Sequence, residues 1–445
     1  MKKFLASLLF LLFLLTACGP LDVHVEPIAT PTPLPSPTAL PTPRPIVPTP
    51  TSPRVITATP SRAPQTPTAS GPDLRFKPGT ALKIVSTHML TAQTGWGVGE
   101  SDQDLVQHIL FTQDGGGTWR DATPPAALTN VPEGGLLATT WFASAENAWV
   151  IYAARAPGTM DPKGLIVWHT ADNGQTWSAG QPLDLAGVNM EFESPSDLGF
   201  LDASHGWLMV HLGVGMSHDY FAAFTTADGG TTWKRILDPS TTIPIMSCVK
   251  SGLTFTSAAN GWITGNCPGL MPKLFIFRTT DSGATWSEAT LPVPPGKAAN
   301  YFASGIACGI NAIDYSSARS LALTLTCTNY NNNTAQSWLY GSNDAGATWS
   351  ERLLPALYTR IDLLNADEGF LVGSMKSDPE ATGAVYHTAN GGADWAITTS
   401  TGWTGQPDFV DAQTGWVVAI HGQVTAFVRT TDGGRTWVEI KPVVG

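Results

Sequence analysis

Charged side chains are scarce in this sequence, since Asp, Glu, Lys and Arg together make up 13% of its 445 residues. Helix bundles and coiled coils carry many charged residues on their exposed faces, so this composition argues against them. Basic residues are the scarcer kind, with 24 Lys and Arg against 35 Asp and Glu and a formal net charge of −11. An acidic chain repels a phosphate backbone, so nucleic acid is not expected as a partner.

The sequence also lacks the common catalytic and metal-binding motifs. It contains no His-Glu-x-x-His segment, no P-loop and no Gly-x-Ser-x-Gly elbow. His211 and His218 stand without a second ligand at metal-binding spacing, and the cysteines are too far apart for a typical zinc site. We therefore expect no metal, no cofactor and no catalytic residue that can be named from the sequence.

The apolar run near the N-terminus is too short to cross a bilayer comfortably. It extends from Phe4 to Leu15, follows Lys2 and Lys3, and leads into Leu15-Thr-Ala-Cys18. This arrangement resembles a bacterial lipoprotein signal peptide, which implies that residues 1–17 are removed and that the thiol of Cys18 is lipidated. The resemblance implies a protein of the cell envelope, anchored on the extracytoplasmic side. An ordinary secretory signal or a buried apolar segment are the alternatives.

Residues 18–74 are dominated by Pro and Thr, as in Pro31-Thr-Pro-Leu-Pro35. Such a stretch has too few apolar residues to form a core and favours extended polyproline II structure. It is interpreted as a spacer between the lipid and a folded domain over residues 75–445. A Pro-rich recognition ligand is the alternative.

The folded part is rich in Gly and Trp, which suits turn-rich β structure, and it contains one short pattern seven times. The pattern is Thr-x-Asp-x-Gly-x-Thr-Trp, and we call each copy a turn segment. Only the sixth copy departs from it strongly, with Asn390 for Asp and Asp394 for Thr. The turn segments span residues 112–119, 170–177, 226–233, 279–286, 342–349, 388–395 and 430–437, and their key residues are Asp114, Asp172, Asp228, Asp281, Asp344, Asn390 and Asp432.

A second pattern precedes each turn segment by about twenty residues and keeps the same phase. It is Gly-Trp or a variant of it: Gly95-Trp96, Ala148-Trp149, Gly206-Trp207, Gly261-Trp262, Ser320-Leu321, Gly369-Phe370 and Gly415-Trp416. Successive key residues are 42 to 63 residues apart, which is room for four short strands per repeat. The sequence therefore predicts an all-β chain of repeated four-stranded antiparallel sheets.

The turn segments resemble the Asp box, or BNR repeat, of sialidases, sortilin-type receptors and photosystem II assembly factors. The resemblance covers residues 75–445 and implies a seven-bladed β-propeller with one Asp box per blade, joining the third and fourth strands. The closure of the ring stays open. Either Leu82 to Thr87 belongs to a self-contained first blade, or N-terminal residues complete the last one.

The chemistry of the pattern favours a structural role. The Asp carboxylate can accept backbone N–H groups across a tight turn, the Gly two residues later can take a positive φ, and the Trp can pack beneath the turn. Catalytic or calcium-binding carboxylates are the alternative for the Asp residues. For the Trp residues the alternative is a platform for carbohydrate.

Four cysteines follow Cys18, and they fall into two pairs of equal spacing. Cys248 and Cys267 are nineteen residues apart, as are Cys308 and Cys327. Each pair brackets a predicted hairpin between first and second strands, so antiparallel pairing predicts two disulfides within sheets. A Cys267–Cys308 bridge or a metal site is the alternative.

Binding is expected on the loops opposite the turn segments. The candidate residues are Glu191, Glu193, His218, Asp219, Tyr220 and Tyr330. Sialidases carry an Arg-Ile-Pro segment and three substrate-binding arginines, but the segment before Asp114 contains no Arg.

The preferred hypothesis is a monomeric protein-binding or assembly-scaffold module, most similar to the photosystem II assembly factors. The alternative is a glycan-binding or glycoside-hydrolysing propeller, and a purely structural surface module is a third possibility.

Overall fold

The computed structural model describes residues 74–102, 104–156, 164–188, 194–215, 218–241, 244–267, 274–303, 306–315, 319–374 and 383–445. Lipidation at Cys18, the signal peptide and nearly all of the Pro/Thr-rich spacer therefore concern residues outside the described part, as do Glu191 and Glu193. The described residues form mainly β-strands, with a few short 3-10 helices that include η1 (Pro125–Leu128), η3 (Pro244–Met246) and η4 (Tyr301–Ala303). Within these residues no helix is long and apolar enough to span a membrane.

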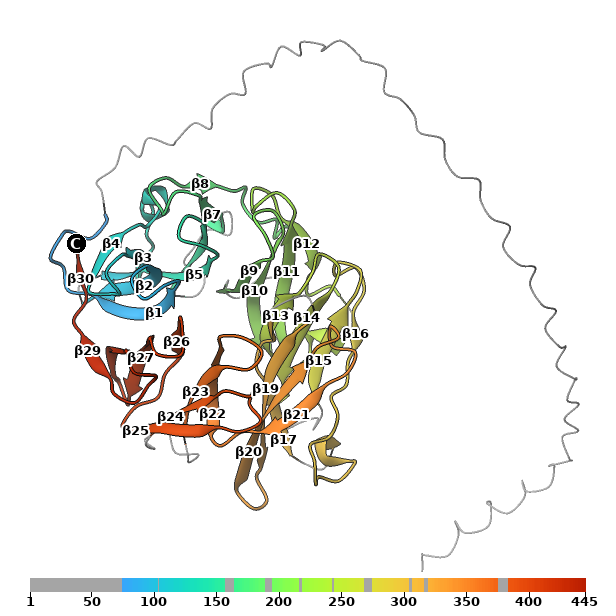
Figure 1. Cartoon of the computed structure of the whole chain (residues 1–445). Coiled ribbons are helices and arrows are strands. Elements are labelled where there is room, and N and C mark those ends of the chain that lie inside the picture. The colour runs from blue at the N-terminus through green and yellow to red at the C-terminus, as the bar shows by residue number, and fades with distance from the viewer. Residues whose placement is uncertain are drawn as a thin grey trace, which may run out of the picture. The chain divides into compact units, whose positions relative to one another are not determined.

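The strands form antiparallel sheets in chain order (Figure 1). Five sheets contain one four-stranded repeat each: β1 (Lys83–Met89), β2 (Gly95–Ser101), β3 (Asp104–Thr112) and β4 (Thr118–Asp121); β5 (Leu136–Phe142), β6 (Ala148–Ala154), β7 (Val167–Thr170) and β8 (Ser178–Ala179); β9 (Ser194–Phe200), β10 (Gly206–Gly215), β11 (His218–Thr226) and β12 (Lys234–Leu237); β22 (Leu357–Leu363), β23 (Gly369–Ser374), β24 (Gly383–Thr388) and β25 (Ala396–Thr401); β26 (Pro407–Phe409), β27 (Gly415–His421), β28 (Val424–Thr430) and β29 (Val438–Ile440).

The remaining sheet has nine strands and joins two repeats through one pair of residues, Asn266 and Gly309. Its first half is β13 (Val249–Phe255), β14 (Gly261–Asn266), β15 (Phe275–Thr279) and β16 (Ser287–Glu288), and its second half is β17 (Ala307–Ile310), β18 (Asp314–Tyr315), β19 (Leu321–Asn329), β20 (Thr334–Ser342) and β21 (Ser350–Leu353). In the second half the innermost strand is thus divided into two short pieces.

The Gly-Trp pattern has a steric and a packing reason. A Cβ atom at Gly206 would lie 2.7 Å from the ring of Phe200, and one at Gly415 would lie 2.5 Å from the ring of Phe409. At Gly206 and Gly415 the inner strand therefore lies too close for a side chain. The following Trp is buried, with Trp96 and Trp416 both 0% exposed, which agrees with core packing and leaves no platform for carbohydrate at these two residues.

Consecutive sheets are held together face to face by these buried tryptophans. The indole N–H of Trp96 donates to Ser144 O at 2.8 Å, in the next sheet along the chain, and that of Trp207 donates to Leu253 O at 2.8 Å. Apolar clusters fill the space between neighbours, as where Trp149 stacks on Phe200 with ring centroids 4.0 Å apart. Four-stranded antiparallel sheets packed face to face in chain order are the arrangement of a β-propeller.

The last sheet packs against the first. Trp416 donates to Gly115 O at 2.9 Å, and Phe427 lies in one cluster with Trp119. The C-terminal strand β30 (Val443–Val444) pairs in parallel with β4 as a fifth strand of the first sheet. Lys83–Met89 is the inner strand of that first sheet, and the last sheet has four strands of its own. The alternative in which N-terminal residues complete the last sheet is therefore wrong.

The beginning of the folded domain docks on the first sheet. Phe76 stacks on His108 with ring centroids 3.8 Å apart, and its backbone N–H donates to Asp121 Oδ2 at 2.8 Å. The carboxylate of Asp121 also contacts Nδ1 of the fully buried His108 at 2.7 Å. The chain is therefore anchored from this point onward.

Both predicted disulfides are present. Cys308 lies directly opposite Cys327 in the β17–β19 pairing. Cys248 and Cys267 flank the β13–β14 pair and are joined across it. Because Asn266 pairs with Gly309, both bridges lie next to the point where the two halves of the nine-stranded sheet meet.

Candidate functional site

The aspartates of the turn segments are occupied by their own turns. Asp281 represents six of the seven: its Oδ1 accepts the Thr279 hydroxyl at 2.8 Å and the Thr285 N–H at 2.9 Å, and its Oδ2 accepts the Thr285 hydroxyl at 2.6 Å. The Gly283 N–H donates to the Thr279 hydroxyl at 2.9 Å, with Gly283 at φ 85°. The Thr285 hydroxyl and N–H lower the pKa of Asp281 to about 2. The carboxylate is therefore ionised and fully used within eight residues.

The sixth turn segment keeps this pattern with exchanged partners. The Asn390 Oδ1 accepts the Asp394 N–H, and its Nδ2 donates to Asp394 Oδ2, both at 2.9 Å. In the other turn segments the Thr hydroxyl donates to the Asp carboxylate. Here the carboxylate belongs to residue 394 and accepts from the amide of residue 390. The two departures from the repeat compensate each other.

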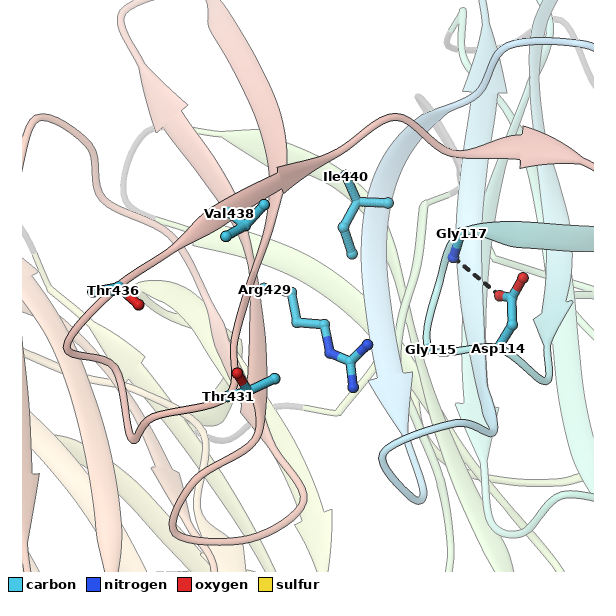
Figure 2. A pocket seen from close by; sticks show the side chains of 8 residues that line it. All are labelled: Asp114, Gly115, Gly117, Arg429, Thr431, Thr436, Val438 and Ile440. Carbon is cyan, nitrogen blue, oxygen red and sulfur yellow. Dashed lines mark hydrogen bonds between the residues drawn. The ribbon is translucent and has the colours of Figure 1, made fainter.

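A pocket of about 310 Å³ lies where the last sheet meets the first (Figure 2). Asp114 and Gly117 line one side, and Arg429, Val438 and Ile440 line the other. The Arg429 guanidinium stacks on Trp416 at 5.0 Å, and Asp114 is bonded within its own turn segment. The pocket therefore belongs to the contact between the two sheets.

Three of the predicted binding residues begin strand β11, and they divide by the alternation of the strand. His218 is exposed and Tyr220 is 37% exposed, with ring centroids 5.8 Å apart. Asp219 between them is only 2% exposed. Its carboxylate contacts His211 Nδ1 at 2.9 Å and accepts a hydrogen bond from the backbone N–H of Lys250 at 2.9 Å. His218 and Tyr220 can meet a partner at the surface, whereas Asp219 is used inside the protein.

Lys250 is a buried cation that the sequence did not reveal. Its Nζ donates to the carbonyl oxygens of Asp219, Ser247 and Cys248 at 2.9 to 3.0 Å and lies over the ring of Phe221 at 5.0 Å. Burial lowers the pKa of Lys250 to about 7, and the charge of Asp219 opposes that shift. Three carbonyl acceptors require the three N–H groups of the ammonium form. This network joins the start of β11 to the Cys248–Cys267 disulfide.

Tyr330 occupies the tip of the long β19–β20 hairpin and is 72% exposed. The Cys308–Cys327 bridge attaches this hairpin to β17 three residues before Tyr330. The neighbouring tip residues are uncharged: Asn329, Asn331, Asn332, Asn333 and Thr334. Second-to-third-strand hairpins lie at the end of each sheet opposite the turn segment, so Tyr220 and Tyr330 project from the same end of their sheets.

The inner strands carry a set of carboxyl groups that sequence reasoning missed. Asp408 Oδ2 accepts the Met89 N–H at 2.8 Å, and Asp362 Oδ2 accepts the Phe409 N–H at 2.5 Å, each from the inner strand of the next sheet. Burial, together with the charges of Asp408 and Asp314, raises the pKa of Asp362 to about 7, although the Phe409 N–H opposes the shift. Burial also raises the pKa of Asp408.

A spacing signal could have identified this set. Asp362 and Asp408 lie opposite Phe370 and Trp416 in the register, each eight residues before it. His88 stands eight residues before Trp96 in the same relation. These three titratable residues could therefore have been found in the sequence by their position eight residues before the aromatic of the Gly-Trp pattern.

No group of three or more His, Cys, Asp or Glu side chains in the described ranges is arranged to hold a metal ion. The described part of the chain thus offers hydrogen-bonding carboxyl groups and exposed tyrosines as its functional groups.

Comparisons with known proteins identify similar structures but no family. No family model matches the chain. No curated protein matches it either. Among solved structures, YCF48 bound to a D1 peptide is 18% identical, with 80% of this chain and 94% of that chain covered and a TM-score of 0.44.

Two further solved structures are similar at the same level. YCF48 from Cyanidioschyzon merolae is 15% identical, with 81% of this chain and 98% of that chain covered and a TM-score of 0.40. An ulvan lyase of the polysaccharide lyase family PL25 is 8% identical, with 83% and 97% covered and a TM-score of 0.45. At these identities neither family membership nor function is carried over to this chain.

Proposed function

We propose that this chain is an exported scaffold that binds a protein partner at the hairpin end of its sheets. The observation that carries the proposal is the display of exposed aromatic residues on braced hairpins. Tyr330 lies on the hairpin that the Cys308–Cys327 bridge attaches to β17, and His218 and Tyr220 lie on β11, which Lys250 links to the segment of Cys248. Tyrosine supplies a large contact area with few rotatable bonds, and a rigid base lowers the entropy lost on binding. The residues that neighbour Tyr330 at the hairpin tip are uncharged, in a chain of net charge −11.

We propose further that the seven repeats are blades of one closed ring and that the turn segments are Asp boxes. The contact of the last sheet with the first, through Trp416 and Phe427, supports closure. The recurrence of one hydrogen-bonding scheme from Asp114 to Asp432 supports the Asp-box assignment.

The proposed location is the extracytoplasmic side of a membrane, with lipid on Cys18 and residues 18–74 as the spacer. The sequence Leu15-Thr-Ala-Cys18 supports this assignment. Expression of the full chain with a radiolabelled fatty acid should label the wild type and not Cys18→Ala. Labelling of Cys18→Ala, or none of the wild type, would contradict it.

Site-specific cross-linking tests the binding surface. A photoreactive amino acid at position 330 or 220 of the full chain in its native cells should give one discrete adduct with another protein. The matched control is position 435, because Arg435 is exposed in a turn segment at the opposite end of its sheet. The same adduct at position 435, or none at 330 and 220, would reject the assigned surface.

A second candidate function is glycoside binding or hydrolysis, favoured by Asp362 and Asp408. A carboxyl group with a pKa of about 7 can donate a proton near neutral pH, as a glycosidase acid does. A fluorogenic glycoside screen of the full chain, with Asp362→Asn and Asp408→Asn alongside, separates the two functions. Turnover that both variants lose supports the enzyme, and turnover that they retain excludes these residues.

A further inference from the structure

The ammonium group of Lys297 lies in an aromatic cage against strand β20. Its Nζ is 5.4 Å from the ring centroid of Tyr301 and 5.8 Å from that of Trp338. The two rings are nearly perpendicular, with an interplanar angle of 79° and centroids 6.0 Å apart, so they form two walls. The same Nζ donates a hydrogen bond to Gln336 Oε1. We call Tyr301, Gln336 and Trp338 the ammonium cage.

The cage has the chemistry of a site for a primary ammonium. The faces of Tyr and Trp rings attract a cation, the more so when it is desolvated. No carboxylate in the described part of the chain pairs with Lys297, so the two rings and one amide oxygen receive its charge. The amide oxygen needs an N–H donor, which a primary ammonium has and a quaternary ammonium lacks. The cage therefore favours the side chain of lysine.

Lys297 enters the cage from an exposed turn. Every residue from Pro295 to Asn300 is exposed except Lys297 itself. Gly296 has a φ of 75°, and a Cβ atom there would have no other atom within 4 Å. Before the turn the chain is attached to the sheet, since Pro292 O accepts the Tyr340 hydroxyl at 2.8 Å. Within the turn, Lys297 is thus the side chain that reaches the sheet.

The cage belongs to the hairpin that carries Tyr330. Gln336 lies opposite Cys327 in the β19–β20 register, so the Cys308–Cys327 bridge is directly beside the cage. The net charge of −11 attracts cationic partners over a long range. A lysine presented by a partner at this hairpin therefore meets both an attractive field and a site of matching chemistry.

We propose that the ammonium cage binds a lysine side chain of the protein partner, and that Lys297 occupies the cage while the partner is absent. The assignment of the lysine to a protein partner rests on the proposed function, whereas the cage can be tested without any partner. Lys297 then acts as a built-in competitor. With the cage open for about one-tenth of the time, an external lysine binds about tenfold more weakly than to an empty cage.

Fluorine NMR of the full chain labelled with fluorotryptophan tests the cage, with Nα-acetyl-lysine amide as the probe. The Trp338 signal is identified by its absence from Trp338→Phe. In Lys297→Ala the probe should shift this signal at a concentration about tenfold lower than in the wild type. Lys234→Ala removes an exposed lysine of β12 instead and should titrate like the wild type.

Two further comparisons decide what the cage recognises. Adding Tyr301→Leu to Lys297→Ala should abolish the shift, and the uncharged Nα-acetyl-norleucine amide should cause none. The cage is rejected if the probe leaves Trp338 unshifted in Lys297→Ala, if it acts there at the wild-type concentration, or if the shift survives Tyr301→Leu. Tighter binding of tetramethylammonium than of the lysine probe would reject lysine as the ligand. Circular dichroism melts verify that each variant is folded, and the wild-type titration needs no variant.

Cross-linking at position 330 tests the partner separately. The adduct should increase in Lys297→Ala and decrease in Tyr301→Leu. An adduct that neither variant changes would reject lysine recognition and leave the proposed function standing. Absence of any adduct would contradict the proposed function, while the probe titration still decides whether the cage binds an ammonium.

Discussion

At the scale of single residues, the hydrogen bonds of the turn segments show why Asp is required and how it can be replaced. The carboxylate accepts from a hydroxyl two residues before it and from an N–H and a hydroxyl four residues after it. When Asn takes the position, its N–H₂ group needs an acceptor where the hydroxyl donor stood. Asp394 provides that acceptor for Asn390.

The Asn390–Asp394 exchange predicts strong coupling between two surface substitutions. Asn390→Asp alone sets two carboxylates against each other and should lower the Tm by about 2–4 °C. The double variant Asn390→Asp/Asp394→Thr restores the common pattern and should recover that loss. Thermal melts of the wild type, both single variants and the double variant form the cycle. Equal losses in single and double variants would show that the two residues do not interact.

At the scale of elements, the hairpin ends depend on links that cross between strands. The β19–β20 hairpin has nine residues in each strand and extends beyond its disulfide toward Tyr330. The β11 strand is held by Lys250 instead, through carbonyl groups of β11 and of the segment before β13. Both hairpins are therefore braced from a neighbouring strand.

Removal of Cys308–Cys327 should loosen one hairpin selectively. Replacing both residues by Ala removes a constraint on a loop of nineteen residues and should cost about 3 kcal/mol. Hydrogen exchange should rise in β17 and β19 and stay unchanged in β1–β4, which serves as the internal control. A uniform rise over all sheets would mean that the bridge stabilises the fold as a whole instead.

At the scale of the whole molecule, the acidic groups divide into two classes with opposite pH effects. Asp281 has a pKa of about 2, below its ordinary value of 3.8, so the stability that it contributes is lost as the pH falls below about 4. Asp362 has a pKa of about 7, above 3.8, so stability is complete at low pH and is lost as the pH rises through 7.

The Tm is therefore expected to be highest near pH 4 to 5 and to decline toward pH 7. Asp362→Asn should remove about 2–4 °C of that decline, after allowance for solvent screening of a half-buried group. Lys250, with a pKa lowered to about 7, acts in the opposite direction only above pH 7, so the range from pH 5 to 7 isolates the carboxyl groups. An unchanged slope in Asp362→Asn would exclude Asp362 as its source.

Repeats and hairpins were predictable from the sequence because their interactions are local. The turn segments close within eight residues, and each disulfide joins cysteines nineteen residues apart across one hairpin. The Gly-Trp pattern was visible too, although its steric reason, the close approach of Phe200 or Phe409, needed the sheets.

The sequence by itself determined the all-β class, the repeated four-stranded sheets and the cysteine pairs, since periodic patterns and short-range hydrogen bonds specify them. The tertiary structure decided which polar residues are internal. Asp219 is buried because strand alternation turns it toward Lys250, and Asp408 is bonded to Met89, 319 residues earlier. The spacing before Trp416 marks Asp408 in the sequence, but it does not reveal Met89 as its partner, because the two come together only when the last sheet packs against the first.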